Sequence, residues 1–253
     1  MELNKECEYG ACFVAGTLVH TDKGLVPIEQ LKVGDMVLSK HESGEGEQAY
    51  KPIIDVFRSE DAQVLQLAYY DVSNPMSDLK AKLLYLTAGH LIWVAEDENG
   101  KAVNDWVSAG DIVGGSVVEF SNGRKAYVDG CQVITGIDDC TGYVLDLMEE
   151  FPEIVVDFSG NKIQSYYVGE NYSGAESSLS EETIAFDENY DVVVRFLDFI
   201  ERGVSPRFFT ATVYNIEVAD FHTYYVGSDG VWVKNEGNCP SHEFNLFWNG
   251  RSQ

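Results

Sequence analysis

Residues 11–19 read Ala-Cys-Phe-Val-Ala-Gly-Thr-Leu-Val, a cysteine followed by an apolar run that contains Gly16 and Thr17. A short apolar run of this kind is typical of a buried β-strand. Taken alone, the stretch fits a core strand that happens to begin with cysteine, since free cysteines are among the most buried residues. Three later stretches, at residues 87–90, 213–222 and 231–235, favour a reactive thiol at Cys12 instead.

The composition is that of a globular, strongly acidic chain. Of its 253 residues, 45% are hydrophobic and 12% aromatic, enough for one large β domain or two small ones with a substantial core. There are 17 Lys and Arg against 42 Asp and Glu, a formal net charge of -25. This charge argues against a general nucleic-acid or anionic-membrane surface, because phosphate groups are bound by basic patches.

The sequence contains no evident membrane or targeting segment. No apolar run approaches the roughly 18 residues of a spanning helix. The N-terminal region lacks the basic start and apolar core of a signal peptide. The chain is therefore either cytosolic or a segment of a longer precursor, and we favour the segment.

Five cysteines lie at positions 7, 12, 131, 140 and 239. They include no Cys-x-x-Cys pair, and their odd number leaves at least one thiol outside any disulfide. Cys131 and Cys140 are as compatible with a disulfide as with two thiols.

The pattern between residues 12 and 130 is typical of an all-β protein with many tight turns. Short apolar runs are separated by Gly, Asn and Asp, which favour turns. The predicted strands here are residues 13–19, 33–39, 53–57, 64–70, 83–87, 91–95 and 117–120. Strand-like sequence returns at residues 208–218, 223–226 and 231–233.

A weak internal repeat is present. Residues 31–37, Leu-Lys-Val-Gly-Asp-Met-Val, resemble residues 112–117, Ile-Val-Gly-Gly-Ser-Val, with one residue missing. Each copy follows a short polar segment, Glu29-Gln30 or Ser108-Ala109, that fits one helical turn. Coincidence in a chain rich in Gly and Val explains the match equally well; a real repeat predicts two similar β halves related by a pseudo-two-fold axis.

Residues 131–207 differ in composition from the strands on either side. Between Ile137 and Asp191 there are fourteen acidic residues, and Lys162 is the only basic one. Residues 174–180 are Ser-rich and indicate a loop. Apolar residues at helical spacing predict an amphipathic helix over residues 191–202. We therefore predict an acidic α/β insertion at about residues 131–207.

Four stretches stand in a fixed order along the chain. Cys12 opens the apolar run, and residues 87–90, Thr-Ala-Gly-His, follow a predicted strand. Residues 213–218, Val-Tyr-Asn-Ile-Glu-Val, precede His222, and residues 231–235, Val-Trp-Val-Lys-Asn, end in asparagine. Each signal is weak alone, because Thr-x-x-His arises often by chance, a lone histidine is usually structural, and asparagine after a strand usually marks a turn.

Together, in this order, the stretches closely resemble the Hint (hedgehog/intein) family, and most nearly the Hint domains of bacterial polymorphic toxins. The blocks that match almost throughout are Cys-Phe-Val-Ala-Gly-Thr-Leu-Val, Leu-Lys-Val-Gly-Asp-Met-Val-Leu, Leu-Thr-Ala-Gly-His-Leu-Ile-Trp-Val and Val-Tyr-Asn-Ile-Glu-Val-Ala-Asp-Phe-His-Thr-Tyr-Tyr-Val-Gly. The resemblance covers residues 12–130 and 208–235 and leaves 131–207 unexplained.

The resemblance implies a flat, horseshoe-like all-β fold with pseudo-two-fold symmetry, which would account for the internal repeat. The Hint domain would occupy residues 12–235. Residues 1–11 would be an upstream flank, and residues 236–253 a downstream linker with the start of a following segment.

At the first end, the resemblance implies that the thiol of Cys12 attacks the carbonyl of Ala11 and converts the peptide bond into a thioester. His90 would protonate the departing amide nitrogen, and Thr87 would donate a hydrogen bond that holds the bent peptide. Such help is needed because an amide is planar and stabilised by resonance.

At the other end, the resemblance implies that the side-chain amide of Asn235 attacks its own carbonyl, forms a succinimide and severs the bond to Glu236. His222 resembles the histidine that assists this step, and Asn215 stands where many inteins have Asp. The fold would bring the two ends together and make intramolecular attack fast.

Three residues depart from the pattern of splicing proteins. Glu236 replaces the Cys, Ser or Thr that accepts the acyl group, and Cys239 would be an inefficient substitute. Lys234 replaces the usual His before the terminal Asn. Asn215 can orient groups but cannot exchange protons as a carboxylate does. We therefore predict cleavage without efficient splicing.

The sequence thus predicts a single-turnover, self-cleaving autoprotease that releases its flanking segments, most plausibly a C-terminal toxin after residue 235. The resemblance places the chain in a secreted or cell-surface bacterial precursor. We expect a monomer whose partners are its own flanks, with no nucleic acid, membrane, cofactor or metal.

Three alternatives stay open. The first is an inactivated Hint scaffold that binds a partner through its acidic insertion. The second is a calcium site at residues 187–191, but Val192 and Asp198 replace the Gly and Glu of a calcium loop, so a solvated acidic face is the better interpretation. The third, sterol transfer of the hedgehog type, would need a sterol-binding appendage, and nothing apolar enough follows Asn235.

Overall fold

The computed structural model describes residues 11–73, 81–145, 152–159, 163–167, 183–184, 199, 202–203 and 207–235. Nearly all regular structure in these ranges is β-strand, which confirms the all-β prediction. None of the helical segments described is long and apolar enough to cross a membrane.

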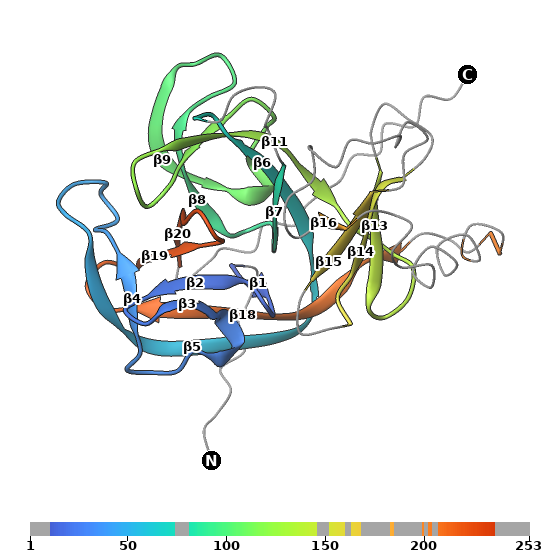
Figure 1. Cartoon of the computed structure of the whole chain (residues 1–253), viewed down its shortest axis with the longest axis horizontal. Helices are drawn as coiled ribbons and strands as arrows, with labels where there is room; N and C mark the ends of the chain where they lie inside the picture. Colours follow the sequence, from blue (N-terminus) through green and yellow to red (C-terminus); the bar gives the residue numbers. More distant parts are fainter. Residues whose placement is uncertain are drawn as a thin grey trace.

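Fourteen of the described strands form one long, curved sheet (Figure 1). Neighbours follow the order β10-β11-β6-β7-β1-β18-β5-β4-β2-β19-β20-β8-β9, with β3 paired to β2. Because β10 also pairs with β8, the first strand of this order meets the last but one. The bounds are β1 (Phe13–Val14), β2 (Leu18–Thr21), β3 (Gly24–Pro27), β4 (Met36–Ser39), β5 (Ala49–Gln63), β6 (Leu65–Asp71), β7 (Lys82–Leu86), β8 (Leu91–Glu96), β9 (Ala102–Ser108), β10 (Val117–Glu119), β11 (Lys125–Val133), β18 (Thr210–Val218), β19 (Thr223–Val226) and β20 (Val231–Lys234).

Two similar halves make up this sheet. The first runs β2, β3, the 3-10 turn η1 (Ile28–Gln30), β4 and β5, and the second runs β8, β9, the 3-10 turn η3 (Ala109–Asp111), β10 and β11. Equivalent strands pair in the same way, because β2 pairs with β4 as β8 does with β10, and β4 pairs with β5 as β10 does with β11. The predicted pseudo-two-fold symmetry is confirmed.

The two sequence repeats form the same turn. Each starts from a 3-10 turn, as predicted, and Leu31 and Ile112 each donate their N–H to the first residue of that turn. Gly34 and Gly115, three residues further on, both have positive φ, 94° and 92°, which glycine adopts without a steric penalty. The predicted one-residue gap is therefore wrong, because the repeats correspond residue for residue.

The described part of the insertion forms a second, six-stranded sheet in the order β16-β15-β14-β13-β12-β17. Its α/β character is not supported, because β-branched and aromatic residues place its described segments in strands. The predicted helix lies outside the described residues apart from Phe199 and Arg202, and so do the Ser-rich loop and the calcium-like stretch. The bounds are β12 (Thr135–Gly136), β13 (Thr141–Leu145), β14 (Pro152–Asp157), β15 (Gln164–Tyr167), β16 (Thr183–Ile184) and β17 (Arg207–Phe208).

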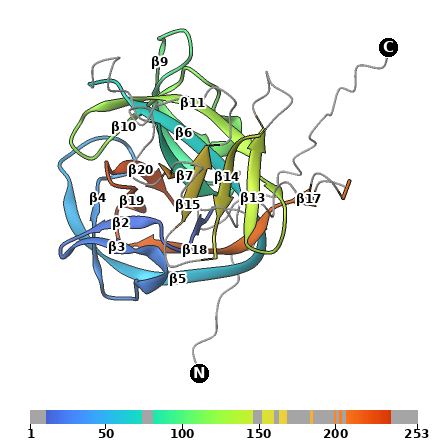
Figure 2. The same ribbon diagram turned by 45° about the vertical axis from the view of Figure 1, so that its right-hand side comes forward.

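This second sheet packs against the first where β7 and β18 lie (Figure 2). The Phe158 ring stacks on Phe209, with centroids 4.5 Å apart, and meets the edge of Tyr85 at 5.3 Å. The Tyr85 hydroxyl also lies 2.6 Å from Ser165 Oγ. The hydrophobic cluster at this junction contains Cys12. The insertion is thus part of the core beside the predicted nucleophile.

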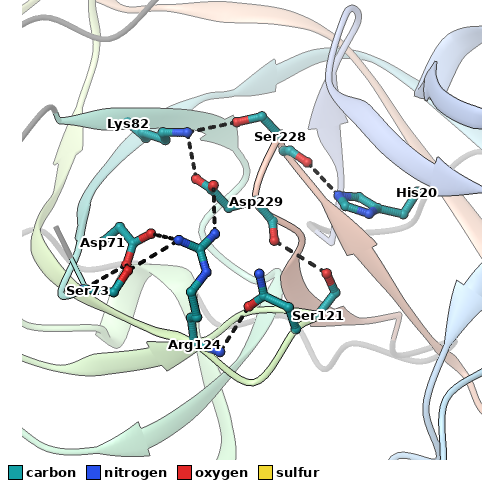
Figure 3. A network of polar contacts seen from close by, with 10 residues as sticks. His20, Asp71, Ser73, Lys82, Ser121, Arg124, Ser228 and Asp229 are labelled. Carbon is teal, nitrogen blue, oxygen red and sulfur yellow. Dashed lines mark hydrogen bonds and ion pairs between the residues drawn. The ribbon is translucent and has the colours of Figure 1, made fainter.

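A polar network at the β19–β20 turn fixes the strand that leads to the C-terminal site (Figure 3). Asp229 in this turn binds Lys82 at 2.9 Å and Arg124 at 3.6 Å. Arg124 also pairs with the buried Asp71, and His20 Nε2 lies 2.9 Å from a carbonyl oxygen of the turn. Because a buried carboxylate needs a partner, these contacts tie the β19–β20 turn to β2, β6, β7 and the residue that precedes β11.

Replacing Gly114 by Ala should destabilise the second half. A Cβ there would lie 2.5 Å from the backbone oxygen of Asp129 in β11, closer than a Cβ contact allows, so the backbone would have to shift. We expect the free energy of unfolding to fall by roughly 1–3 kcal/mol, measured by urea denaturation. Gly130→Ala is the matched control, because its Cβ would meet nothing within 4 Å; equal losses for both variants would contradict this packing.

Candidate functional site

Hydrogen bonds and ring contacts bring all six predicted site residues to one region. It lies near the place where β1, β7 and β18 meet (Figure 1). Phe13 of β1 pairs with Leu86 of β7 and with Tyr214 of β18, so the residues that flank these strands become neighbours. The six are Cys12 before β1, Thr87 and His90 in the turn after β7, Asn215 in β18, His222 between β18 and β19, and Asn235 after β20.

The peptide between Ala11 and Cys12 is held from both sides. Thr87 Oγ1 accepts a hydrogen bond from the Cys12 N–H at 2.8 Å and donates to the Cys12 carbonyl at 3.3 Å. Asn215 Nδ2 donates to the Ala11 carbonyl oxygen. Thr87 was predicted to donate a hydrogen bond that holds this peptide, and its contact with the peptide nitrogen is one in which it accepts. A donor on the carbonyl oxygen polarises the carbonyl that the thiol would attack.

Cys12 itself is buried, with 1% of its surface exposed. The hydrophobic cluster to which it belongs also contains Tyr85 of β7, Val213 of β18 and, from the insertion, Val144 and Val156. A thiol in such a place is largely shielded from bulk water.

His90 is fully buried, and its ring centroid lies 4.2 Å from that of Phe13 and 6.2 Å from that of Tyr224. Burial lowers its pKa to about 3, although the nearby Ala11 backbone favours the charged form. Neither ring nitrogen makes a hydrogen bond of ordinary geometry with the described residues. The imidazole is therefore neutral at physiological pH, with one N–H and one lone pair.

Asn215 is the centre of the site. Its Nδ2 donates to the Ala11 carbonyl and, at 2.8 Å, to Asn235 Oδ1. Its Oδ1 accepts from the Tyr224 hydroxyl at 2.6 Å and from the Ile216 N–H at 2.8 Å. A carboxylate would face the first two oxygens without a proton to donate, so an amide suits this position.

Asn235 is buried at the other end of the same network. Its N–H donates to the His222 carbonyl at 3.2 Å, and its Nδ2 donates to Glu217 Oε2 at 2.8 Å. Glu217 Oε1 lies 2.5 Å from His222 Nδ1. The imidazole of His222 thus reaches the asparagine amide through Glu217.

The sequence patterns did not single out Glu217 or Tyr224. Alternate residues of a strand share a face, so the spacing of Asn215 and Glu217 in β18 is the signal that points to Glu217. The contact with Tyr224 depends on how β19 lies against β18, and no local pattern indicates it.

Of the three residues that depart from the splicing pattern, the structure describes Asn215 and Lys234. Lys234 Nζ binds Glu42 Oε2 at 2.8 Å, so its charge is directed to that carboxylate. Glu236 and Cys239 lie outside the described residues. Cys131 and Cys140 are not joined by a disulfide. Within the described ranges, no group of three His, Cys, Asp or Glu residues is placed to hold a metal ion.

Comparisons with known proteins relate the chain to one family. The family model of the Hint module matches residues 2–137. Among solved structures, a bacterial intein-like domain from Clostridium thermocellum is 22% identical, with 89% of this chain and 99% of that chain covered and a TM-score of 0.48. A DnaB intein from Synechocystis sp. PCC 6803 is 8% identical, with coverage of 90% and 99% and a TM-score of 0.45. The gp41-1 intein is 14% identical, with coverage of 90% and 100% and a TM-score of 0.41. No curated protein matches the chain.

Burial of His90 should make stability depend on pH. Between pH 6.5 and about 3 the unfolded chain binds a proton on this histidine and the folded chain does not, so stability is lost as pH falls. Below pH 6.5, the free energy of unfolding should fall by roughly 1.4 kcal/mol per pH unit more in the wild type than in His90→Gln. Urea denaturation at a series of pH values measures both slopes; parallel slopes would contradict the assignment.

Proposed function

The chain belongs to the Hint module family and is a self-processing domain that acts on its own precursor, and we propose that it cleaves its backbone at two bonds without efficient splicing. The two bonds are Ala11–Cys12 and Asn235–Glu236. The observation that carries the proposal is the amide of Asn215, which contacts the carbonyl of Ala11 and the side chain of Asn235 at once.

At the first bond, the sulfur of Cys12 attacks the carbonyl carbon of Ala11, and the carbon–nitrogen bond breaks with its electron pair going to the Cys12 nitrogen. The thiol proton must reach that nitrogen. A neutral His90 suits this transfer, because it can accept a proton at one ring nitrogen and release one from the other. The donor on the Ala11 oxygen stabilises the charge that develops there. Water or an added thiol then releases the upstream flank from the thioester.

At the second bond, the amide nitrogen of Asn235 attacks the carbonyl carbon of the same residue, and a succinimide forms as the bond to Glu236 breaks. Splicing would require an acyl acceptor at position 236, and a carboxylate cannot serve as one. The products are therefore separated segments rather than ligated ones.

The proposal extends to the identity of the released segments. We assign the downstream segment to a toxin and the precursor to a secreted or cell-surface bacterial protein, on the strength of the sequence blocks shared with polymorphic-toxin Hint domains. The chain's partners are then its own flanks.

An inactive scaffold is the second candidate. It is favoured by Lys234, whose ammonium binds Glu42 where splicing proteins have a histidine. The two candidates differ in whether the purified chain changes mass.

Freshly synthesised chain should break at both bonds. Intact-mass spectrometry over time, with and without an added thiol, should show loss of residues 1–11 and of residues 236–253. Cys12→Ala should abolish the first loss and Asn235→Ala the second, because each removes one nucleophile. A wild-type mass that stays equal to that of the double variant would favour the scaffold.

Asn215→Ala should slow both cleavages, since one side chain serves both ends. Loss of a donor on the attacked carbonyl predicts a decrease of roughly 10²-fold at Ala11–Cys12. Asn99→Ala is the control, because Asn99 is an exposed amide in a turn. If only one of the two cleavage rates changed, the shared role of Asn215 would be wrong.

A further inference from the structure

The side-chain amide of Asn235 has a defined orientation. Asn215 Oδ1 must face the Ile216 N–H, which can only donate, so Asn215 Nδ2 faces Asn235. The atom of Asn235 that accepts this bond must be its oxygen, and the nitrogen therefore points to Glu217. The atom that attacks in cyclisation is thus in contact with a carboxylate.

Glu217 links this buried amide to the solvent. Its side chain is 15% exposed, and that of its partner His222 is 46% exposed. One carboxylate oxygen accepts from Asn235 Nδ2 and the other meets the imidazole. Asp55 stands opposite Glu217 in the β5–β18 pair, and its Oδ1 accepts the N–H of Val56. The three groups Asn235, Glu217 and His222 therefore form a path from the nucleophile to water.

We propose that Glu217 is the catalytic base of the Asn235 step and that His222 is the residue that positions its carboxylate and exchanges its proton with solvent. This inference rests on the proposed cleavage at Asn235–Glu236. It assigns the proton transfer to a carboxylate on β18.

Each proton and electron pair in this step has a defined destination. Glu217 Oε2 takes a proton from Asn235 Nδ2 as this nitrogen forms its bond to the Asn235 carbonyl carbon. The bond from that carbon to the nitrogen of Glu236 breaks, and its electron pair stays on the nitrogen, which takes one proton from water. Glu217 returns its proton to solvent through His222, so no net proton is gained or lost. Meanwhile Asn215 Nδ2 donates to Asn235 Oδ1 and stabilises the negative charge that this amide acquires.

Neighbouring charged groups are less suited to this role. The ammonium of Lys234 is bound to Glu42, and a cation cannot accept the amide proton. The ring of His222 is directed to Glu217. A carboxylate at residue 217 therefore supplies proton transfer in a chain that lacks both the histidine before the terminal Asn and the aspartate at residue 215.

The test is Glu217→Gln in the full chain, followed by mass spectrometry after cell-free synthesis. Glutamine keeps an oxygen that accepts from Asn235 but cannot take a proton, so cleavage at Asn235–Glu236 should slow by about 10²-fold or more. Thiol-induced cleavage at Ala11–Cys12 should be unchanged, which shows that the variant folds. Glu60→Gln removes an exposed carboxylate from the neighbouring strand β5 and is the matched control.

A second variant tests the role of His222. His222 has φ of 58°, a conformation that glycine adopts without strain, so His222→Gly preserves the backbone and opens space for a small molecule. Cleavage at Asn235–Glu236 should slow in this variant and recover when imidazole is added, whereas Glu217→Gln should not respond to imidazole. If His222 had only a structural role, added imidazole would not restore cleavage in His222→Gly.

The outcomes separate the two proposals. If the wild type never breaks at Asn235–Glu236, the proposed function fails at that bond. If the wild type cleaves and Glu217→Gln cleaves at the same rate, the base assignment is overturned. Failure of imidazole to restore His222→Gly would overturn the assigned role of His222.

Discussion

The side-chain amide of Asn215 joins the two ends of the domain through its own hydrogen bonds. Its nitrogen donates to Ala11 and Asn235, and its oxygen accepts from Tyr224 and Ile216. Because this side chain is 1% exposed, loss of one partner would leave a buried polar group unsatisfied, at about 1–3 kcal/mol. The positions of Ala11 and Asn235 are thus coupled through the hydrogen bonds of one buried amide.

The pseudo-two-fold arrangement explains why these ends meet in the middle of the molecule. β1 lies between β7 and β18, and the β19–β20 hairpin lies between β2 of the first half and β8 of the second. The first strand and the last hairpin therefore occupy places between the halves. The polar network around Asp229 holds the turn of that hairpin, so the position of Asn235 depends on ion pairs as well as on apolar packing.

In the mechanism that we propose, protons are transferred differently at the two ends. His90 is buried among aromatic rings and stays neutral, which suits transfer between a thiol and an amide nitrogen without exchange with water. His222 is half exposed and paired with Glu217, which suits exchange with solvent. The imidazole of His90 is thus shielded from solvent, and that of His222 is in contact with it. Asn215, the asparagine between them, needs no charge of its own.

The sequence by itself determined the β class and the two 3-10 turns, because these follow from local periodicity and turn chemistry. Its resemblance to the Hint family suggested the six candidate site residues, whose roles stay predictions. The sequence misplaced a gap in the repeat, and the α/β insertion that it predicted is not supported by the strands described there, whose pairing depends on residues far apart in the chain. Only the tertiary structure decided that Glu217 meets Asn235, that Thr87 accepts from Cys12, and that His90 is dry. These contacts depend on pairing between strands far apart in the chain, and burial sets the charge state of each group once that pairing is made.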